Sequence, residues 1–238
     1  MQNIVLLAAA GHGSRLGGDV AKQWHKINGI SITEYTLRVF LQAKDISKIV
    51  VLYNKENLSD AKELLLIDPK VSIVEGGATA QKTREIGLKT IDDTEANVII
   101  HDAVRPLVSV ELIEKTLKSI DGYDAVVPIL KNRDTLFNIK ENRQMYSYDI
   151  VQAQTPQVFK YSSIMEAFKR GEEDNIFDSF YSPFELLHHY GYKINFIDGE
   201  LLNFKITYVE DIDICSKILK NKTHRELPHL KEGDFLPN

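Results

Sequence analysis

The sequence is organised by apolar runs, rich in Val and Ile, that alternate with amphipathic stretches. A strand that is apolar along its whole length must be covered on both faces, and amphipathic stretches between such strands supply the covering helices. The rhythm therefore predicts an α/β fold: a layered, Rossmann-like, mostly parallel sheet with helices on both faces. The expected strands lie in 4–10, 48–53, 71–77, 97–103 and 124–130, and the expected helices between them in 32–43, 58–66 and 110–120.

Length and composition limit the remaining choices. The 238 residues are enough for a single domain spanning 1–238, and 43% hydrophobic residues is ordinary for a globular chain. A net charge of −5 argues against general nucleic-acid binding, which needs surplus Lys and Arg. No apolar run reaches the roughly 20 residues of a membrane span, so we expect a cytoplasmic protein that does not enter a membrane. The single cysteine, Cys215, lies in an apolar helical pattern and is expected in the core.

A polar stretch at 132–153 interrupts the alternation of strand and helix patterns, and it predicts a protruding β-arm. Alternating apolar residues flank the turn-prone segment 140–144, as in a long hairpin. They are Phe137 and Ile139 before the turn, and Tyr146 and Tyr148 after it. An isolated hairpin is marginally stable in water, so the arm is expected to pack on a second subunit. Further helices and a strand follow, and 222–238 is expected to be a loosely held tail.

A glycine-rich loop, Ala9 to Gly18, follows the first apolar run. Backbone amides of such a loop can turn toward a phosphate chain. The dinucleotide fingerprint is incomplete because Leu16 occupies the place of its third glycine, and the Gly-Lys-Ser/Thr of a Walker A loop is missing. Arg15 and Lys22 could neutralise a triphosphate. The alternative interpretation is a tight structural turn with solvated basic residues.

Four motifs in order resemble one family. They are L-x-A-A-G-x-G-x-R-x-G with Lys22-Gln23, the stretch 101–106 (HDAVRP), the stretch 154–159 (QTPQVF) and the stretch 203–207 (NFKIT). This series is similar to the cytidylyltransferases of the methylerythritol-phosphate and ribitol-phosphate type, within the sugar nucleotidyltransferases. The resemblance implies transfer of a cytidylyl group from CTP to a small phosphorylated alcohol, with Mg²⁺ as cofactor. It also implies a homodimer in which the arm crosses to the partner.

The resemblance assigns residues to the nucleotide. Lys22 would hold the α-phosphate of CTP, Arg15 the β- and γ-phosphates, and Lys205 would reach the α-phosphate from the other side. Such cations would stabilise a transition state in which negative charge spreads over the phosphorus. The stretch 76–83 corresponds to the turn that reads cytosine. The remaining nucleotide-binding residues implied are Ala9, Ala10, Gly11, His12, Gly13, Ser14, Gly77, Ala78 and Thr83.

The acceptor side rests on Asp102, which ends an expected strand at the edge where open α/β sheets bind ligands. The resemblance implies that Asp102 contacts the acceptor hydroxyls and helps hold Mg²⁺. Arg105 would orient Asp102 or bind the acceptor phosphate, and His101 is expected to be structural. The other implied acceptor contacts are Asp134, Thr135 and Lys160.

Several positions depart from the family pattern. Thr79 and Ala80 replace an acidic residue and an arginine, Ala21 replaces a proline, and Lys160 replaces an arginine. The acidic T-D-D/E stretch is replaced by 177–182 (FDSFYS). Thr79 and Ala80 lie in the turn that reads cytosine and leave other pyrimidine triphosphates open beside CTP. Lys160 and 177–182 lie where the acceptor should bind, and they favour ribitol 5-phosphate over 2-C-methyl-D-erythritol 4-phosphate. A silent nucleotide-binding scaffold and a dinucleotide-dependent oxidoreductase are the competing hypotheses.

Overall fold

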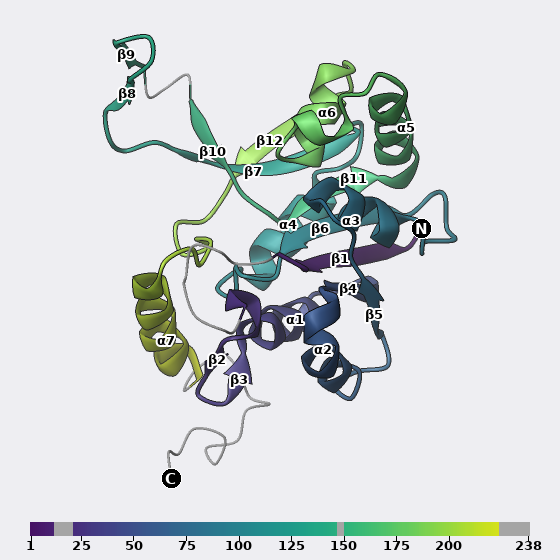
Figure 1. Cartoon of the computed structure of the whole chain (residues 1–238), viewed down its shortest axis with the longest axis vertical. Helices are drawn as coiled ribbons and strands as arrows, with labels where there is room; N and C mark the ends of the chain where they lie inside the picture. The colour runs from purple at the N-terminus through teal and green to yellow at the C-terminus, as the bar shows by residue number, and fades with distance from the viewer. Residues whose placement is uncertain (12–20, 147–149, 224–238) are drawn as a thin grey trace.

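The structure is a computed structural model that describes residues 1–11, 21–146 and 150–223 (Figure 1). Its centre is a sheet with the order β10-β7-β11-β6-β1-β4-β5, and β12 also pairs with β7. Most strands run in one direction, whereas β10 and β11 are antiparallel to their neighbours. The α/β class and the mostly parallel sheet are therefore confirmed. The strands are β1 (Asn3–Ala9), β4 (Ile46–Tyr53), β5 (Val71–Glu75), β6 (Asn97–Asp102), β7 (Ala125–Lys131), β10 (Val151–Ala153), β11 (Gln157–Lys160) and β12 (Ile194–Asp198).

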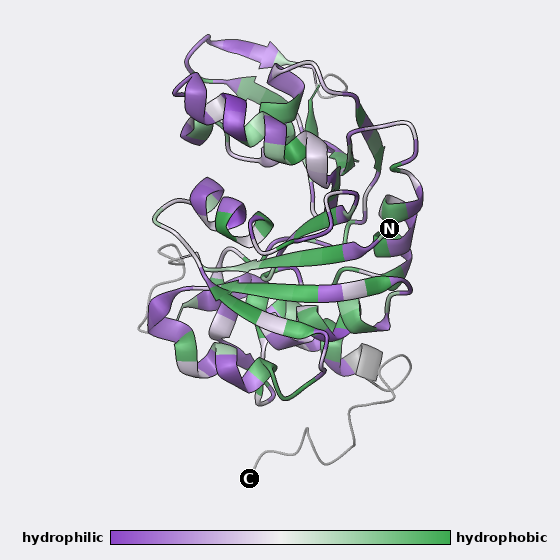
Figure 2. Ribbon diagram, turned by 90° about the vertical axis from the view of Figure 1, so that its right-hand side faces the viewer, coloured by the Kyte–Doolittle hydropathy of each residue, from purple (hydrophilic) through white to green (hydrophobic). Residues whose placement is uncertain are grey.

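Helices cover both faces of this sheet because successive residues of its strands point to opposite sides. Val5 and Leu7 of β1 pack in the cluster that contains residues of α1 and α4, while Ile4 and Leu6 pack in the cluster of α3, α5 and α6. Figure 2 shows the central strands coloured as hydrophobic along most of their length. The helices are α1 (Ile32–Gln42), α2 (Leu58–Leu64), α3 (Ala80–Leu88), α4 (Val110–Lys118), α5 (Tyr161–Glu173), α6 (Pro183–His189) and α7 (Val209–Thr223), and short 3-10 turns lie at η1 (Lys22–Trp24), η2 (Lys55–Asn57) and η3 (Phe177–Ser179).

A third, smaller core lies beside the main sheet. It joins α7 to the small hairpin of β2 (Lys26–Ile27) and β3 (Ile30–Ser31), and to two functional loops through Val104 and Ile206. Cys215 lies in this cluster and is fully buried, which confirms the expectation that it is a core residue. The cluster supports the loops that carry Asp102 and Lys205.

The thiol of Cys215 is expected to be unreactive in the folded protein. Burial raises its pKa to about 12, and the thiolate is the reactive form. A thiol-specific chromogenic reagent should label the native chain slowly and the urea-unfolded chain at once. Cys215 is the chain's single cysteine, so Cys215→Ser provides the blank. Rapid stoichiometric labelling of the folded protein would contradict the buried position.

A small hairpin lies within the range 132–153. β8 (Leu136–Asn138) and β9 (Arg143–Met145) form an antiparallel hairpin that projects from the main sheet (Figure 1). Phe137, Ile139 and Tyr146 of the arm are exposed, whereas Tyr148 lies outside the described residues. The last part of the 132–153 range is β10, which pairs with β7 and so belongs to the sheet.

Two further sequence predictions concern the chain end and the membrane. The expected tail, 222–238, begins inside α7, which ends at Thr223, and 224–238 lies outside the described residues. Among the described helices, none is both long and apolar enough to span a bilayer.

The strand order defines where a ligand should bind. From β1 the chain proceeds to β4 and β5 on one side, and later returns to form β6 on the other side of β1. The carboxyl ends of β1 and β6 therefore flank a topological switch point, which is where open α/β sheets bind ligands.

Candidate active site

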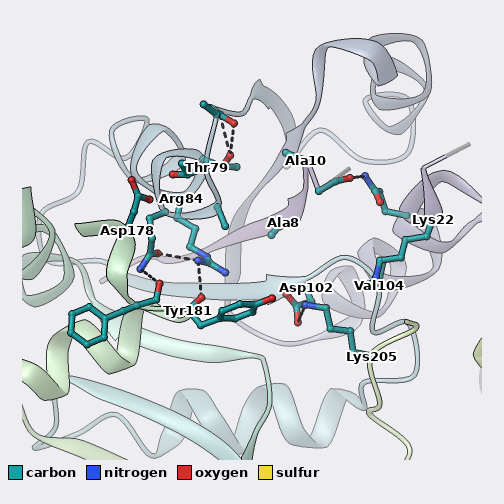
Figure 3. Close-up of a pocket in the computed structure, with 18 residues that line it drawn as sticks. Ala8, Ala10, Lys22, Thr79, Arg84, Asp102, Val104, Asp178, Tyr181 and Lys205 are labelled. Atoms are coloured by element: carbon teal, nitrogen blue, oxygen red, sulfur yellow. Dashed lines mark hydrogen bonds and ion pairs between the residues drawn. The ribbon is translucent and has the colours of Figure 1, made fainter. Parts of the chain in front are cut away.

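A pocket of about 520 Å³ opens at this switch point (Figure 3). Its walls come from segments far apart in the sequence: the end of β1, η1, the turn into α3 with α3 itself, the end of β6, the segment around η3, and the loop before α7. The lining residues are Ala8, Ala10, Gly11, Lys22, Gln23, Gly77, Ala78, Thr79, Ala80, Gln81, Thr83, Arg84, Asp102, Val104, Asp178, Phe180, Tyr181 and Lys205.

Gln23 fixes the chain where the glycine loop begins. Its buried side-chain amide donates to the carbonyl of Ala9 at 2.9 Å and to that of Gly11 at 2.5 Å. The hydroxyl of Thr33 in turn donates to the Gln23 carbonyl at 2.7 Å. This arrangement places Lys22 at the pocket while its neighbour holds the loop.

The turn between β5 and α3 is closed by a hydroxyl. Thr83 accepts a hydrogen bond from the amide of Gly77 at 3.0 Å, and Thr79 caps α3 by accepting from the amide of Lys82 at 3.0 Å. A Cβ on Gly76 would lie 2.9 Å from the Cβ of Ala10, so glycine permits the turn to approach the end of β1. The structure thereby brings Gly77, Ala78 and Thr83 together with the start of the glycine loop.

Asp102 is the centre of an ion cluster at the end of β6. One oxygen, Oδ2, lies 3.0 Å from Nε of Arg105 and 3.2 Å from Nζ of Lys205. Burial opposes ionisation of Asp102, but the positive charges of Lys205 and Arg105 outweigh it and hold its pKa well below the usual range. Asp102 is therefore a permanent carboxylate that orients Lys205 at the pocket.

His101 braces Asp102 from inside the protein. Its Nε2 lies 3.4 Å from the carbonyl of Arg105, which can only accept, so Nε2 carries the proton. Burial lowers the pKa of His101 to about 3, so the ring is neutral and Nδ1 accepts. The Thr155 hydroxyl donates to Nδ1 at 3.1 Å and accepts from the amide of Asp102 at 3.1 Å. This fully enclosed ring supports a structural role for His101.

Gln154 and Asn203 connect the remaining motifs through hydrogen bonds. The Gln154 amide donates to the carbonyl of Glu200 at 2.9 Å and to that of Asn203 at 3.2 Å. Asn203 donates to the carbonyl of Thr155 at 2.8 Å, and its own carbonyl accepts from Arg105 at 2.9 Å. Three motifs that are distant in sequence thus form one network that positions Lys205 against Asp102.

Thr155→Val is expected to destabilise the protein by about 1–3 kcal/mol, because it leaves the buried Asp102 amide and His101 Nδ1 without partners. Urea unfolding measures this loss. Thr90→Val is the matched control, since among the described residues the Thr90 hydroxyl only donates to the Gly87 carbonyl at the end of α3. An equal loss in both variants would argue against the bracing role of Thr155.

The structure brings together some of the implied site residues and separates others. Lys22, Lys205 and Asp102 line the pocket with Ala10, Gly11, Gly77, Ala78 and Thr83. Arg105 is absent from the lining and holds Asp102 instead. His12, Gly13, Ser14 and Arg15 lie outside the described residues.

Four implied contacts do not belong to the pocket of the same chain. Ala9 is buried at the end of β1, where its carbonyl is used by Gln23. Lys160 pairs in register with Asn97, at the end of β6 opposite Asp102, because β11 runs antiparallel to β6. Lys160 therefore does not line this pocket, and its assignment to the acceptor stays a prediction. Asp134 and Thr135 precede β8 in the arm, outside the pocket wall.

Sequence reasoning missed several residues that shape the site. Gln154 and Asn203 form hydrogen bonds with residues far away in the sequence, and the motifs that contain them do not show which residues these are. Gln23 stands next to Lys22 in the first motif, which was the available signal. The sequence does not single out Arg84, because it lies on α3 just beyond the stretch 76–83, which is interpreted only as a turn.

The geometry limits where Mg²⁺ could bind. The described part of the chain holds no cluster of three or more acidic, His or Cys side chains of the kind that encloses a metal. Asp102 offers Oδ1, for which no partner is recorded among the described residues, while Oδ2 carries both cations. A single carboxylate fits Mg²⁺ when phosphates and water supply the other ligands.

A pocket with two lysines around a fixed carboxylate, beside a glycine-bounded turn, suits transfer of a nucleotidyl group rather than hydride transfer. The fold and the site thus define a nucleotidyltransferase. The sequence profile of IspD, 2-C-methyl-D-erythritol 4-phosphate cytidylyltransferase, matches residues 3–221. The chain belongs to this family and is a CTP-dependent cytidylyltransferase.

Individual relatives agree with the family match. The 2-C-methyl-D-erythritol 4-phosphate cytidylyltransferase of Thermotoga neapolitana is 31% identical, with 92% of this chain and 97% of the relative covered. The enzyme of the same name from Clostridium novyi is 32% identical, with the same coverage. Among solved structures, 4-diphosphocytidyl-2C-methyl-D-erythritol synthase from Anaerococcus prevotii has the same fold, with a TM-score of 0.81, 24% identity and coverage of 92% and 96%.

Proposed function

We propose that the chain transfers CMP from CTP to 2-C-methyl-D-erythritol 4-phosphate and releases pyrophosphate. The observation that carries the proposal is the meeting of Lys22, Lys205 and Asp102 with the turn at Gly77 in one pocket. The acceptor is chosen because the relatives reported above bear this name. They support methylerythritol phosphate over ribitol 5-phosphate, which the sequence departures had favoured.

The reaction needs positioning and charge stabilisation. An oxygen of the acceptor phosphate attacks the α-phosphorus of CTP, the bond to the bridging oxygen breaks, and pyrophosphate leaves with the electron pair. Lys22 and Lys205 would stabilise the charge that develops on the α-phosphate. Asp102 keeps Lys205 oriented throughout, since its carboxylate stays ionised. Mg²⁺, held in part by Asp102 Oδ1, would supply further neutralisation of the phosphates.

The proposal includes a homodimer formed through the arm. Phe137, Ile139 and Tyr146 expose apolar surface on a hairpin that has little support from its own chain. Packing on a partner would bury this surface and could bring Asp134 and Thr135 to the partner's pocket. Light scattering after gel filtration tests the dimer, and Ile139→Glu should yield monomer.

The cytoplasmic location of the protein stays a prediction.

The deciding experiment is pyrophosphate release with Mg²⁺ and CTP. The acceptor panel should contain 2-C-methylerythritol 4-phosphate, ribitol 5-phosphate, erythritol 4-phosphate and glycerol 3-phosphate. The proposal expects the highest kcat/KM for methylerythritol phosphate. Higher kcat/KM for ribitol phosphate would overturn the acceptor, and no turnover of any acceptor by folded protein would overturn the proposed activity.

A further inference from the structure

Arg84 of α3 lies in the pocket wall, where it adds a guanidinium group to the ammonium groups of Lys22 and Lys205. Its NH1 group donates to Oε1 of Gln81 at 2.9 Å and, at 3.4 Å, to the carbonyl of Tyr181. Its Nε is buried and has no hydrogen-bond partner within the described ranges. Figure 3 shows the guanidinium directed into the pocket near Tyr181. No hydrogen bond to its Nη2 is found within the described ranges either, and this group can donate to a ligand in the pocket.

Among the residues that the structure describes, no close partner neutralises the charge of Arg84. Within the described part of the chain, no carboxylate lies within 4.0 Å of its guanidinium. Both oxygens that accept from Arg84, Oε1 of Gln81 and the carbonyl of Tyr181, are neutral. Burial lowers the pKa of Arg84, and the more distant charges of Asp102 and Glu185 oppose this effect. Since a partly buried cation without a close counterion is costly, an anionic ligand would relieve the cost.

The position of Arg84 indicates which anion. Lys22 and Lys205 lie on one side of the pocket in Figure 3, whereas Arg84, Asp178 and Tyr181 lie on the other. A nucleotide that reaches from the lysines to the turn at 76–83 leaves the part of the second side formed by Arg84 and 178–181 for the other reactant. That reactant carries a phosphate at the reaction centre and hydroxyls beyond it.

We propose that Arg84 binds the phosphate of the acceptor alcohol, and that the carboxylate of Asp178 accepts hydrogen bonds from its hydroxyls. A guanidinium suits this task because it can donate two parallel hydrogen bonds to one phosphate. The inference rests on the proposed function and adds the residue that receives the acceptor. It makes the wall formed by Arg84 and 178–181 the surface that selects the acceptor.

Steady-state kinetics of Arg84→Gln test the assignment. We expect KM for the acceptor to rise about 10- to 100-fold, because a hydrogen bond to a charged group is lost, and KM for CTP to change at most a few-fold. Arg84→Lys should restore part of the acceptor affinity, since it keeps the charge but not the paired donors. A rise in KM for CTP alone, or no change in either constant, would overturn the inference.

Ser182→Ala separates binding from support of the wall. The Ser182 hydroxyl donates to Oε1 of Gln157 at 2.8 Å and holds the same segment without contributing a charge. We expect its acceptor KM to match that of the wild type. If Ser182→Ala reproduces the defect of Arg84→Gln, Arg84 acts as a tether for 178–181 and the inference is wrong.

A binding measurement keeps this inference separate from the proposed function. Inorganic phosphate is titrated calorimetrically into protein saturated with the α,β-methylene analogue of CTP. Wild type should bind it more tightly than Arg84→Gln by the same fold-change, whichever alcohol is the true acceptor. If methylerythritol phosphate is not turned over but this difference persists, the proposed acceptor fails and the role of Arg84 stands. Equal phosphate affinities would refute that role.

Discussion

Lys205→Ala is expected to lower kcat by about 10²-fold or more. Nζ of Lys205 faces the pocket, 3.2 Å from Oδ2 of Asp102, where it can stabilise the negative charge that develops on the α-phosphate. Loss of one preorganised donor to a transition-state oxyanion costs about 10²–10³ in kcat. Because the interaction strengthens in the transition state, kcat and kcat/KM should fall together. Pyrophosphate release under saturating CTP and acceptor measures the effect.

Lys118→Ala is the matched control for Lys205→Ala. Lys118 is also a lysine paired with a carboxylate, Glu114 at 3.6 Å, but it lies on the exposed side of α4. Its removal should leave kcat within about two-fold of wild type, as expected for a surface pair. Near-normal turnover in Lys205→Ala would refute the assignment of Lys205 to the α-phosphate.

The fold was predictable because its strongest signal is local. The run 4–10 is apolar at every position and 97–103 contains the apolar run 98–100, a pattern typical of strands whose two faces are both covered. The antiparallel insertion of β11 between β6 and β7 was not predictable in the same way. The stretch 157–160 is too short to show its direction, which is set by the strands β6 and β7 that it pairs with.

The site was predictable only in part, for a related reason. The resemblance identified Lys22, Asp102 and Lys205, which the structure brings to one pocket. It could not show that Lys160 lies at the opposite end of β6, because that depends on the register of two antiparallel strands. It also did not point to Arg84, whose side chain reaches the pocket face only once α3 has formed.

Asp102→Asn is expected to reduce kcat by about 10²-fold while the protein remains folded. The amide keeps the shape of the side chain but removes the charge that orients Lys205 and pairs with Arg105. Breaking a buried pair by removing one partner costs about 3–5 kcal/mol, and the partly exposed Lys205 makes the cost here smaller. Urea unfolding should therefore detect a loss, and Asp121→Asn on the exposed turn after α4 serves as control.

The pH dependence of Asp102→Asn distinguishes orientation from proton transfer. The folded pKa of Asp102 is lowered below the unfolded value of about 3.9, so its stabilisation is complete above about pH 4 and is lost only as the pH falls further. The ratio of wild-type to variant kcat should then be constant between about pH 6 and 9. A ratio that changes across this range would mean that Asp102 titrates during turnover. A higher Mg²⁺ concentration for half-maximal rate in the variant would support Oδ1 as a metal ligand, whereas an unchanged requirement would leave Asp102 with orientation alone.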